Sequence, residues 1–229
     1  MNVACARIVR LALTMAAGLG VTAAAAAACE GPREVREATL ASIKAFVADK
    51  RMSVLTFVGF SGAGYEDPDA MLRDAARILA GQDPARILVN VGATAEGIGA
   101  VYAIARRNGF TTMGIVSTLA RDESVALSEC VDYVFYVKDS TWGGRIPGSD
   151  GLSPTSEAVV AVSTSIVGIG GGEVARDEML EARRRGTPVT FIPADMNHRI
   201  AREKARKQGR SDPVDFRGAA EAALAAGGR

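Results

Sequence analysis

The chain has 229 residues, of which 48% are hydrophobic and 23% charged, and its formal net charge at pH 7 is +1. This length supports one full-sized domain, or a domain plus an extension, with a hydrophobic core large enough to be stable without disulfide or metal cross-links. A net charge this close to zero argues against a nucleic-acid partner. We interpret the basic run from Arg199 to Arg210 as the solvated face of a helix.

The first 28 residues have the plan of a secretory signal peptide. Arg7 and Arg10 form a basic start, an apolar centre follows, and a run of small residues ends in front of Cys29. The sequence therefore predicts a signal peptide over residues 1–28 and an exported, periplasmic protein. Ala-Ala-Ala-Cys is also a degenerate lipobox, so a membrane anchor through a lipidated Cys29 is an alternative. A translation start at Met52 is another, and it would make the protein cytoplasmic.

Residues 29–51 are predicted to form an N-terminal helix and linker. Apolar residues such as Val35 and Ile43 fall roughly on one side of this segment, with charges elsewhere. Behind the signal peptide, Cys29 and Cys130 make one possible pair, which is not a disulfide framework. We interpret Cys130 as a buried small apolar residue.

From residue 52 to residue 229, strand-like apolar runs alternate with helical patterns, which is typical of βαβ units. The sequence predicts an α/β fold, Rossmann-like and doubly wound, with a mostly parallel sheet of about six strands and helices on both faces. The strands are expected near 53–59, 86–92, 111–116, 131–137, 164–169 and 188–192. The helices are expected near 67–81, 95–108, 121–129, 154–163, 173–185, 197–208 and 215–226.

Three of the predicted strands end in glycine-rich turns that lead into helices. In a parallel sheet the carboxyl ends of the strands share one edge, so these turns gather around one crevice. Glycine lets the backbone approach a ligand, and the first N–H groups of a helix favour phosphate. The turn at 170–173, with Gly171 expected at the surface, is the favoured phosphate site. The predicted ligand-binding residues are Gly59, Ser61, Gly62, Gly92, Thr94, Gly97, Gly170, Gly171 and Gly172.

The one long connection runs from Lys138 to Ser153 and is polar and rich in glycine. Loops of this length are often functional lids. The only tryptophan, Trp142, lies in this loop. Its side chain either stacks on a bound base or fixes the loop to the domain.

Several kinds of chemistry have no support in the sequence. With one histidine, His198, and few cysteines, we expect no metal site and no resident cofactor. The chain has neither a Gly-x-Ser-x-Gly elbow nor a Gly-x-x-x-x-Gly-Lys-Ser/Thr loop, which argues against a hydrolase triad and an ordinary NTPase.

The order of the glycine turns, with the helix opening Gly97-Ile-Gly-Ala-Val and a Gly-Gly turn before a helix that carries glutamate, resembles the SLOG superfamily over about residues 52–195. The similarity is to its LOG-type branch, whose members were once thought to be lysine decarboxylases. The branch signature Pro-Gly-Gly-x-Gly-Thr-x-x-Glu overlays residues 170–178 and ends at Glu178. Val174 and Ala175 replace its later glycine and its threonine, and its upstream Arg-Lys pair falls near Thr155.

The resemblance implies a Rossmann-like phosphoribohydrolase, typically a dimer, which cleaves the N-glycosidic bond of a nucleoside 5′-monophosphate with Glu178 as catalytic acid. The lost signature residues favour instead a degenerate domain that binds a nucleotide or related phosphorylated small molecule. A third hypothesis is an interaction protein on a Rossmann-like scaffold. The sequence leaves open whether the protein is an enzyme and whether it forms a homodimer.

Overall fold

The computed structural model describes residues 29–224, and the predicted signal peptide and the last five residues lie outside this range. Seven strands form one sheet in which every pair is parallel, in the order β1-β5-β4-β3-β2-β6-β7. Their bounds are β1 Glu34–Ala38, β2 Ser53–Gly59, β3 Ile87–Val91, β4 Thr111–Ser117, β5 Tyr133–Val137, β6 Ser165–Ile169 and β7 Val189–Ile192. The predicted α/β, Rossmann-like fold is confirmed, with one strand more than expected.

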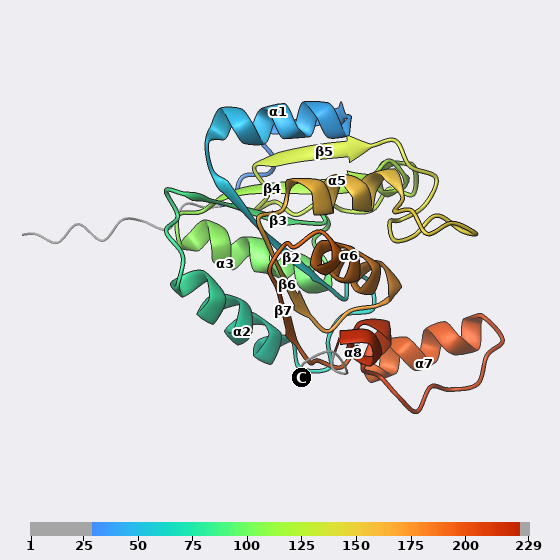
Figure 1. Cartoon of the computed structure of the whole chain (residues 1–229). Coiled ribbons are helices and arrows are strands. Elements are labelled where there is room, and N and C mark those ends of the chain that lie inside the picture. Colours follow the sequence, from blue (N-terminus) through green and yellow to red (C-terminus); the bar gives the residue numbers. More distant parts are fainter. Residues whose placement is uncertain (1–28, 225–229) are drawn as a thin grey trace, which may run out of the picture.

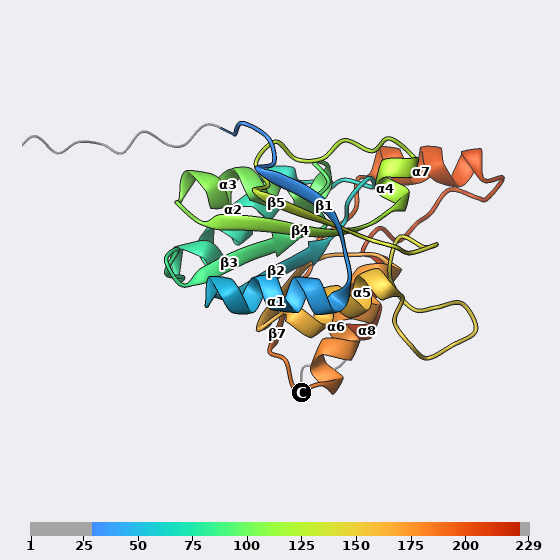
Figure 2. The ribbon, with the colours of Figure 1, turned by 90° about the horizontal axis from the view of Figure 1, so that it is seen from above.

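Helices cover both faces of the sheet (Figures 1 and 2). One face packs on α2 and α3, and the other on a layer formed by α1, α5, α6 and α8. The helices are α1 Leu40–Lys50, α2 Pro68–Ala80, the 3-10 turn η1 Gly97–Ala100, α3 Val101–Arg107, α4 Leu119–Asp122, α5 Pro154–Val162, α6 Glu173–Arg184, α7 His198–Lys207 and α8 Gly218–Leu224.

The predicted helix over residues 29–51 is wrong in its first half. Glu34–Ala38 is the edge strand β1, and the helix begins only after Thr39, which forms a capping box with Ser42. At this edge most of the strand's side chains face solvent, with Val35 48% exposed, so β1 lacks the apolar pattern of a buried strand. The sheet therefore begins well before the domain boundary expected at residue 52.

The interpretation of Cys130 as a buried small apolar residue is wrong, because Cys130 is only partly buried. It forms a disulfide with Cys29, across 101 residues of sequence. A backbone hydrogen bond from Gly31 N to the Glu129 carbonyl lies beside this link, at 2.8 Å. Together they hold the segment that leads into β1 against the segment that leads into β5.

The helix expected at 121–129 is also wrong, because α4 ends at Asp122. Ser124 then takes a left-handed conformation with φ of 56°, and Leu127 forms an antiparallel bridge with Thr94. This segment covers the end of β3.

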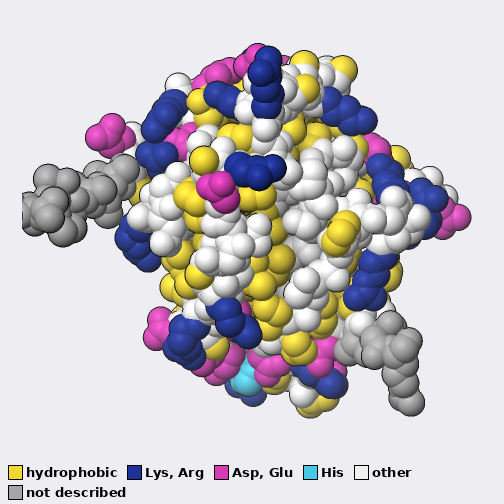
Figure 3. All heavy atoms as spheres, turned by 60° about the vertical axis from the view of Figure 1, so that its left-hand side comes forward, with side chains coloured by type: hydrophobic (Ala, Val, Ile, Leu, Met, Phe, Trp, Pro, Cys, Tyr) yellow, Lys and Arg dark blue, Asp and Glu magenta, His cyan; other side chains and the backbone are white. Residues whose placement is uncertain are grey.

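On the face in Figure 3, acidic and basic side chains mix around a centre of apolar and uncharged ones.

Candidate functional site

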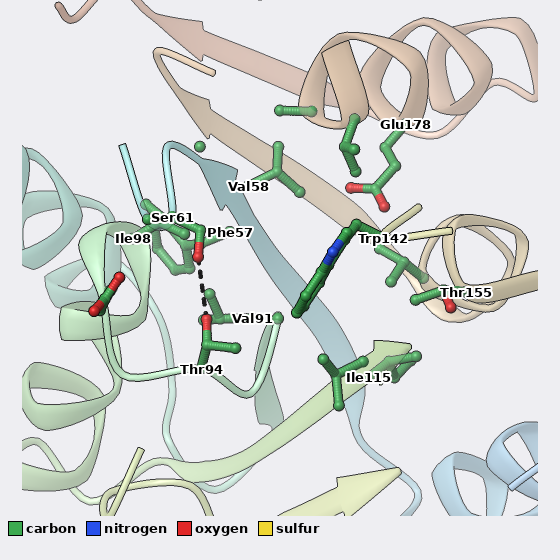
Figure 4. Close-up of a pocket in the computed structure, with 18 of the residues that line it drawn as sticks. Phe57, Val58, Ser61, Val91, Thr94, Ile98, Ile115, Trp142, Thr155 and Glu178 are labelled. Carbon is green, nitrogen blue, oxygen red and sulfur yellow. Dashed lines mark hydrogen bonds between the residues drawn. The ribbon is translucent and has the colours of Figure 1, made fainter. Parts of the chain in front are cut away.

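A cavity of about 620 Å³ opens at the carboxyl edge of the sheet. Its walls come from the ends of β2, β3 and β4, from the turns that follow β2 and β3, and from α5 and α6 (Figure 4). Strands β2 and β6 are neighbours in the sheet. After β2 the chain continues to β3 on one side, and after β6 it continues to β7 on the other side, so the connections that follow these two strands diverge. This is a topological switch point, where open α/β sheets bind their ligands.

The structure brings several of the predicted site residues to this cavity. The first two glycine turns contribute Gly59, Ser61 and Gly62 from one and Gly92 and Thr94 from the other. The hydroxyls of Ser61 and Thr94 lie 3.2 Å apart and join the two turns (Figure 4). The turns therefore present a pair of hydroxyl groups and exposed backbone at the mouth of the cavity.

Gly97 does not line the cavity. It has a φ of 58°, and a Cβ there would lie 2.1 Å from the carbonyl oxygen of Phe60. The next residue, Ile98, donates its N–H to the same carbonyl at 2.7 Å. Gly97 thus allows η1 to pack directly on the first turn.

The third glycine turn, the predicted phosphate site, also lies outside the cavity lining. Gly170 packs on the ring of Phe60, and the Gly171 carbonyl accepts the N–H of Ala220 at 3.0 Å. Gly171 is buried, so the expectation of a surface position is wrong. Helix α8 covers this turn, and the two buried glycines of the turn, Gly170 and Gly171, allow close packing. Gly172 is partly exposed and is the N-cap of α6.

Glu178, one turn into α6, points its carboxyl group towards the cavity (Figure 4). The residue is 5% exposed, and its Oε1 accepts a hydrogen bond of 2.6 Å from the Ser156 hydroxyl. Burial raises the pKa of Glu178 to about 7, Ser156 opposes that rise, and the neighbouring Asp177 carboxylate adds to it. Near neutral pH this carboxyl group is therefore available in both its protonated and ionised forms.

The long loop passes directly over Glu178. Gly144 donates its N–H to Ser156 Oγ at 2.7 Å, and Arg145 donates its N–H to Asp177 at 3.0 Å. The base of the loop is held by Asp139, which accepts from Thr155 N at 2.9 Å. These contacts fix the loop to the starts of α5 and α6.

Trp142, carried by this loop, extends its indole ring into the cavity between the two hydroxyl groups of the turns and Thr155 (Figure 4). Trp142 remains 42% exposed. The apolar side chains that line the cavity include Ile115 and Val159. The cavity therefore offers a planar aromatic surface at its mouth and aliphatic side chains further in.

Among residues 29–224, Lys204 on α7 is the one basic residue that lines the cavity. No ion pair joins it to a carboxylate within residues 29–224. Arg145 and Arg176 do not line the cavity and pair with Asp177. Glu96 lines the cavity with its carboxylate near Gly62.

The sequence reasoning missed Lys204 and the buried Asn90, which both line the cavity. Lys204 lies within the basic run interpreted as solvated, and only the tertiary fold brings α7 to the mouth. Asn90 carried a signal, because it is a polar residue inside an otherwise apolar strand. Within residues 29–224 no cluster of three potential metal ligands occurs, and no described helix is long and apolar enough to cross a membrane.

No protein-family model and no curated protein sequence matches this chain. Among solved structures it is similar to the molybdenum cofactor carrier protein MCP from Chlamydomonas reinhardtii. One structure of that protein aligns over 62% of this chain and 76% of that chain, with 17% identity and a TM-score of 0.45. A second aligns over 77% and 95%, with 15% identity and a TM-score of 0.45. A structure of a protein called TM1055 aligns over 60% and 72%, with 23% identity and a TM-score of 0.43.

At such low TM-scores and identities these matches carry no argument about ligand or family. The fold class follows from the parallel sheet itself.

Proposed function

We propose that the cavity binds a nucleotide or a related phosphorylated small molecule. The observation that carries this proposal is the cavity of about 620 Å³ at the switch point, bordered by the hydroxyl-bearing glycine turns, one tryptophan and one lysine that forms no ion pair within residues 29–224. Its volume lies in the usual range for small-molecule sites.

The groups around the cavity match the parts of a nucleotide. The lysine ammonium and the hydroxyls of Ser61 and Thr94 suit a phosphate group. The indole of Trp142 and the aliphatic wall suit a planar base. The carboxyl groups of Glu96 and Glu178 suit sugar hydroxyls, and Glu96 would oppose a phosphate placed directly beside it.

Isothermal titration calorimetry with AMP and adenosine tests this proposal. The wild type is expected to bind AMP more tightly than adenosine. Lys204→Ala should weaken AMP binding about 10- to 150-fold and leave adenosine unaffected, since one charge-assisted contact is worth about 1.5–3 kcal/mol. Lys207→Ala, on the same helix but outside the cavity lining, is the matched control. If the wild type and Lys204→Ala bind AMP equally well, the phosphate group does not lie beside Lys204. If the wild type binds neither AMP nor adenosine, the proposal is contradicted.

A specific observation favours a second candidate, a phosphoribohydrolase that cleaves the N-glycosidic bond. Glu178 is buried beside the cavity with a pKa of about 7, which suits a general acid at neutral pH. Incubation with nucleoside monophosphates should then release free base, and Glu178→Gln should slow release about 10²-fold or more. Base release that survives this change would exclude Glu178 as the acid, and no release by the wild type would leave binding alone.

We also propose that the protein is exported. The Cys29–Cys130 disulfide supports this, because disulfides persist mainly in oxidising compartments. A Cys29 sulfur in a disulfide is not free for a lipid thioether, so the two uses exclude each other. Intact mass of the protein recovered from cell fractions separates the alternatives: a chain that begins near Cys29 without lipid supports export, and one that begins at Met52 contradicts it.

A further inference from the structure

The inner end of the cavity lies between the sheet and α5, where β3 presents a single polar side chain. Asn90 pairs with Thr56 of the neighbouring strand β2 and is fully buried, yet it lines the cavity. Leu88, two residues earlier on β3, packs in the core cluster beneath α1 and α5. Alternation along the strand therefore directs Asn90 to the same α5-facing side.

Three hydrogen bonds fix the direction in which the Asn90 amide is held. The Ser163 hydroxyl donates to the Val159 carbonyl at 2.7 Å, and a carbonyl accepts only. With its proton committed, Ser163 accepts from Thr56 across 2.6 Å. Thr56 Oγ1 in turn accepts from Asn90 Nδ2 at 3.1 Å. This chain of three hydrogen bonds holds the Asn90 amide with its nitrogen towards Thr56.

The other end of the amide has no partner. Asn90 Oδ1 is buried and accepts no hydrogen bond from any described residue. A rotated amide would place its oxygen against Thr56 Oγ1, which has already committed its proton to Ser163. The structure therefore holds an unpaired acceptor, in a fixed orientation, on a residue that lines the cavity.

We infer that Asn90 Oδ1 selects ligands that bring an N–H or O–H donor to the inner end, such as a base with an exocyclic amino group. This inference rests on the proposed nucleotide binding and names the base class. A site built around a buried polar group discriminates strongly against an analogue that lacks the matching group, since that group then stays unpaired. The chain of hydrogen bonds from Thr56 to Val159 fixes which atom of the amide meets the ligand, so the site selects a donor and not an acceptor.

Donor-deletion pairs test the inference by calorimetry. AMP is compared with purine riboside 5′-monophosphate, which lacks the 6-amino group, and GMP with IMP, which lacks the 2-amino group. The wild type is expected to prefer the amino-bearing member of at least one pair by tenfold or more. Asn90→Leu should bring that ratio close to one, with a melting temperature close to that of the wild type. Leucine removes the unpaired Oδ1 but also the hydrogen bond from Nδ2 to Thr56, and these two effects on stability oppose each other.

Thr56→Val is the second variant, because it frees the amide to rotate while Asn90 stays in place. This variant should reduce the preference for the amino-bearing nucleotide without abolishing nucleotide binding. Equal affinities within both pairs for the wild type, or a preference that Asn90→Leu leaves intact, would overturn the role of Asn90 while nucleotide binding stands. If no member of either pair binds, the proposed function and this inference both fail.

Discussion

Replacing Glu178 by glutamine is expected to make the protein more stable at alkaline pH than the wild type. Burial raises the pKa of this carboxyl group from 4.5 to about 7, so between these values the folded state holds a proton that the unfolded state has lost. Wild-type stability must then fall as pH rises, by about 1.4 kcal/mol per pH unit within that window, and level off above pH 7. Integrated from pH 5 to pH 8, the loss from this one group is about 2.5 kcal/mol.

Glutamine keeps an oxygen that accepts the Ser156 hydroxyl but carries no charge, so the variant escapes this loss. Urea unfolding of both proteins at pH 5, 6, 7 and 8 measures the difference directly. The stability gap in favour of Glu178→Gln should widen by about 2–3 kcal/mol from pH 5 to pH 8. Glu173→Gln, an exposed position on the same helix, should show no such widening. A gap that stays constant over this range would refute the reasoning that burial, with its raised pKa, destabilises the ionised Glu178.

Three further predictions concern the fold. Gly171→Val should destabilise the protein by about 1–3 kcal/mol in urea unfolding, because a Cβ there meets the Ala175 Cβ at 2.6 Å; an unchanged midpoint would contradict the packing described. Cys130→Ser should cost about 2–4 kcal/mol under oxidising conditions and nothing under reducing ones. A chain that begins at Met52 lacks β1 and α1, so its melting temperature should drop markedly, and a cooperative transition at the full-length temperature would contradict this.

The internal strands were predictable from sequence because each is a short apolar run between turn signals. The expected strand at 53–59 coincides with β2, and the others differ by only a few residues. The edge strand β1 was not predictable in this way. Its side chains are mostly exposed, and what fixes it is pairing with β5 together with the disulfide from Cys29, both long-range contacts.

The site was predictable as a region but not in its details. The ends of parallel strands had to converge, and Gly59, Gly92 and Glu178 do line one cavity. Glycines serve ligand approach and close packing equally, and only the position of α8 shows that Gly171 serves packing. Nothing in the residue pattern of α7 indicates that this helix brings Lys204 to the mouth, because that placement depends on long-range packing.

Fluorescence of Trp142 gives the most direct test of the central claim that this cavity binds a nucleotide. It is the only tryptophan in the chain, and its ring lies in the cavity, so no other residue contributes indole signal. Titration with nucleoside 5′-monophosphates is expected to change its emission saturably, with the parent nucleosides binding more weakly. If no nucleoside monophosphate changes the emission or the melting temperature at millimolar concentration, the cavity does not bind nucleotides and the account is contradicted.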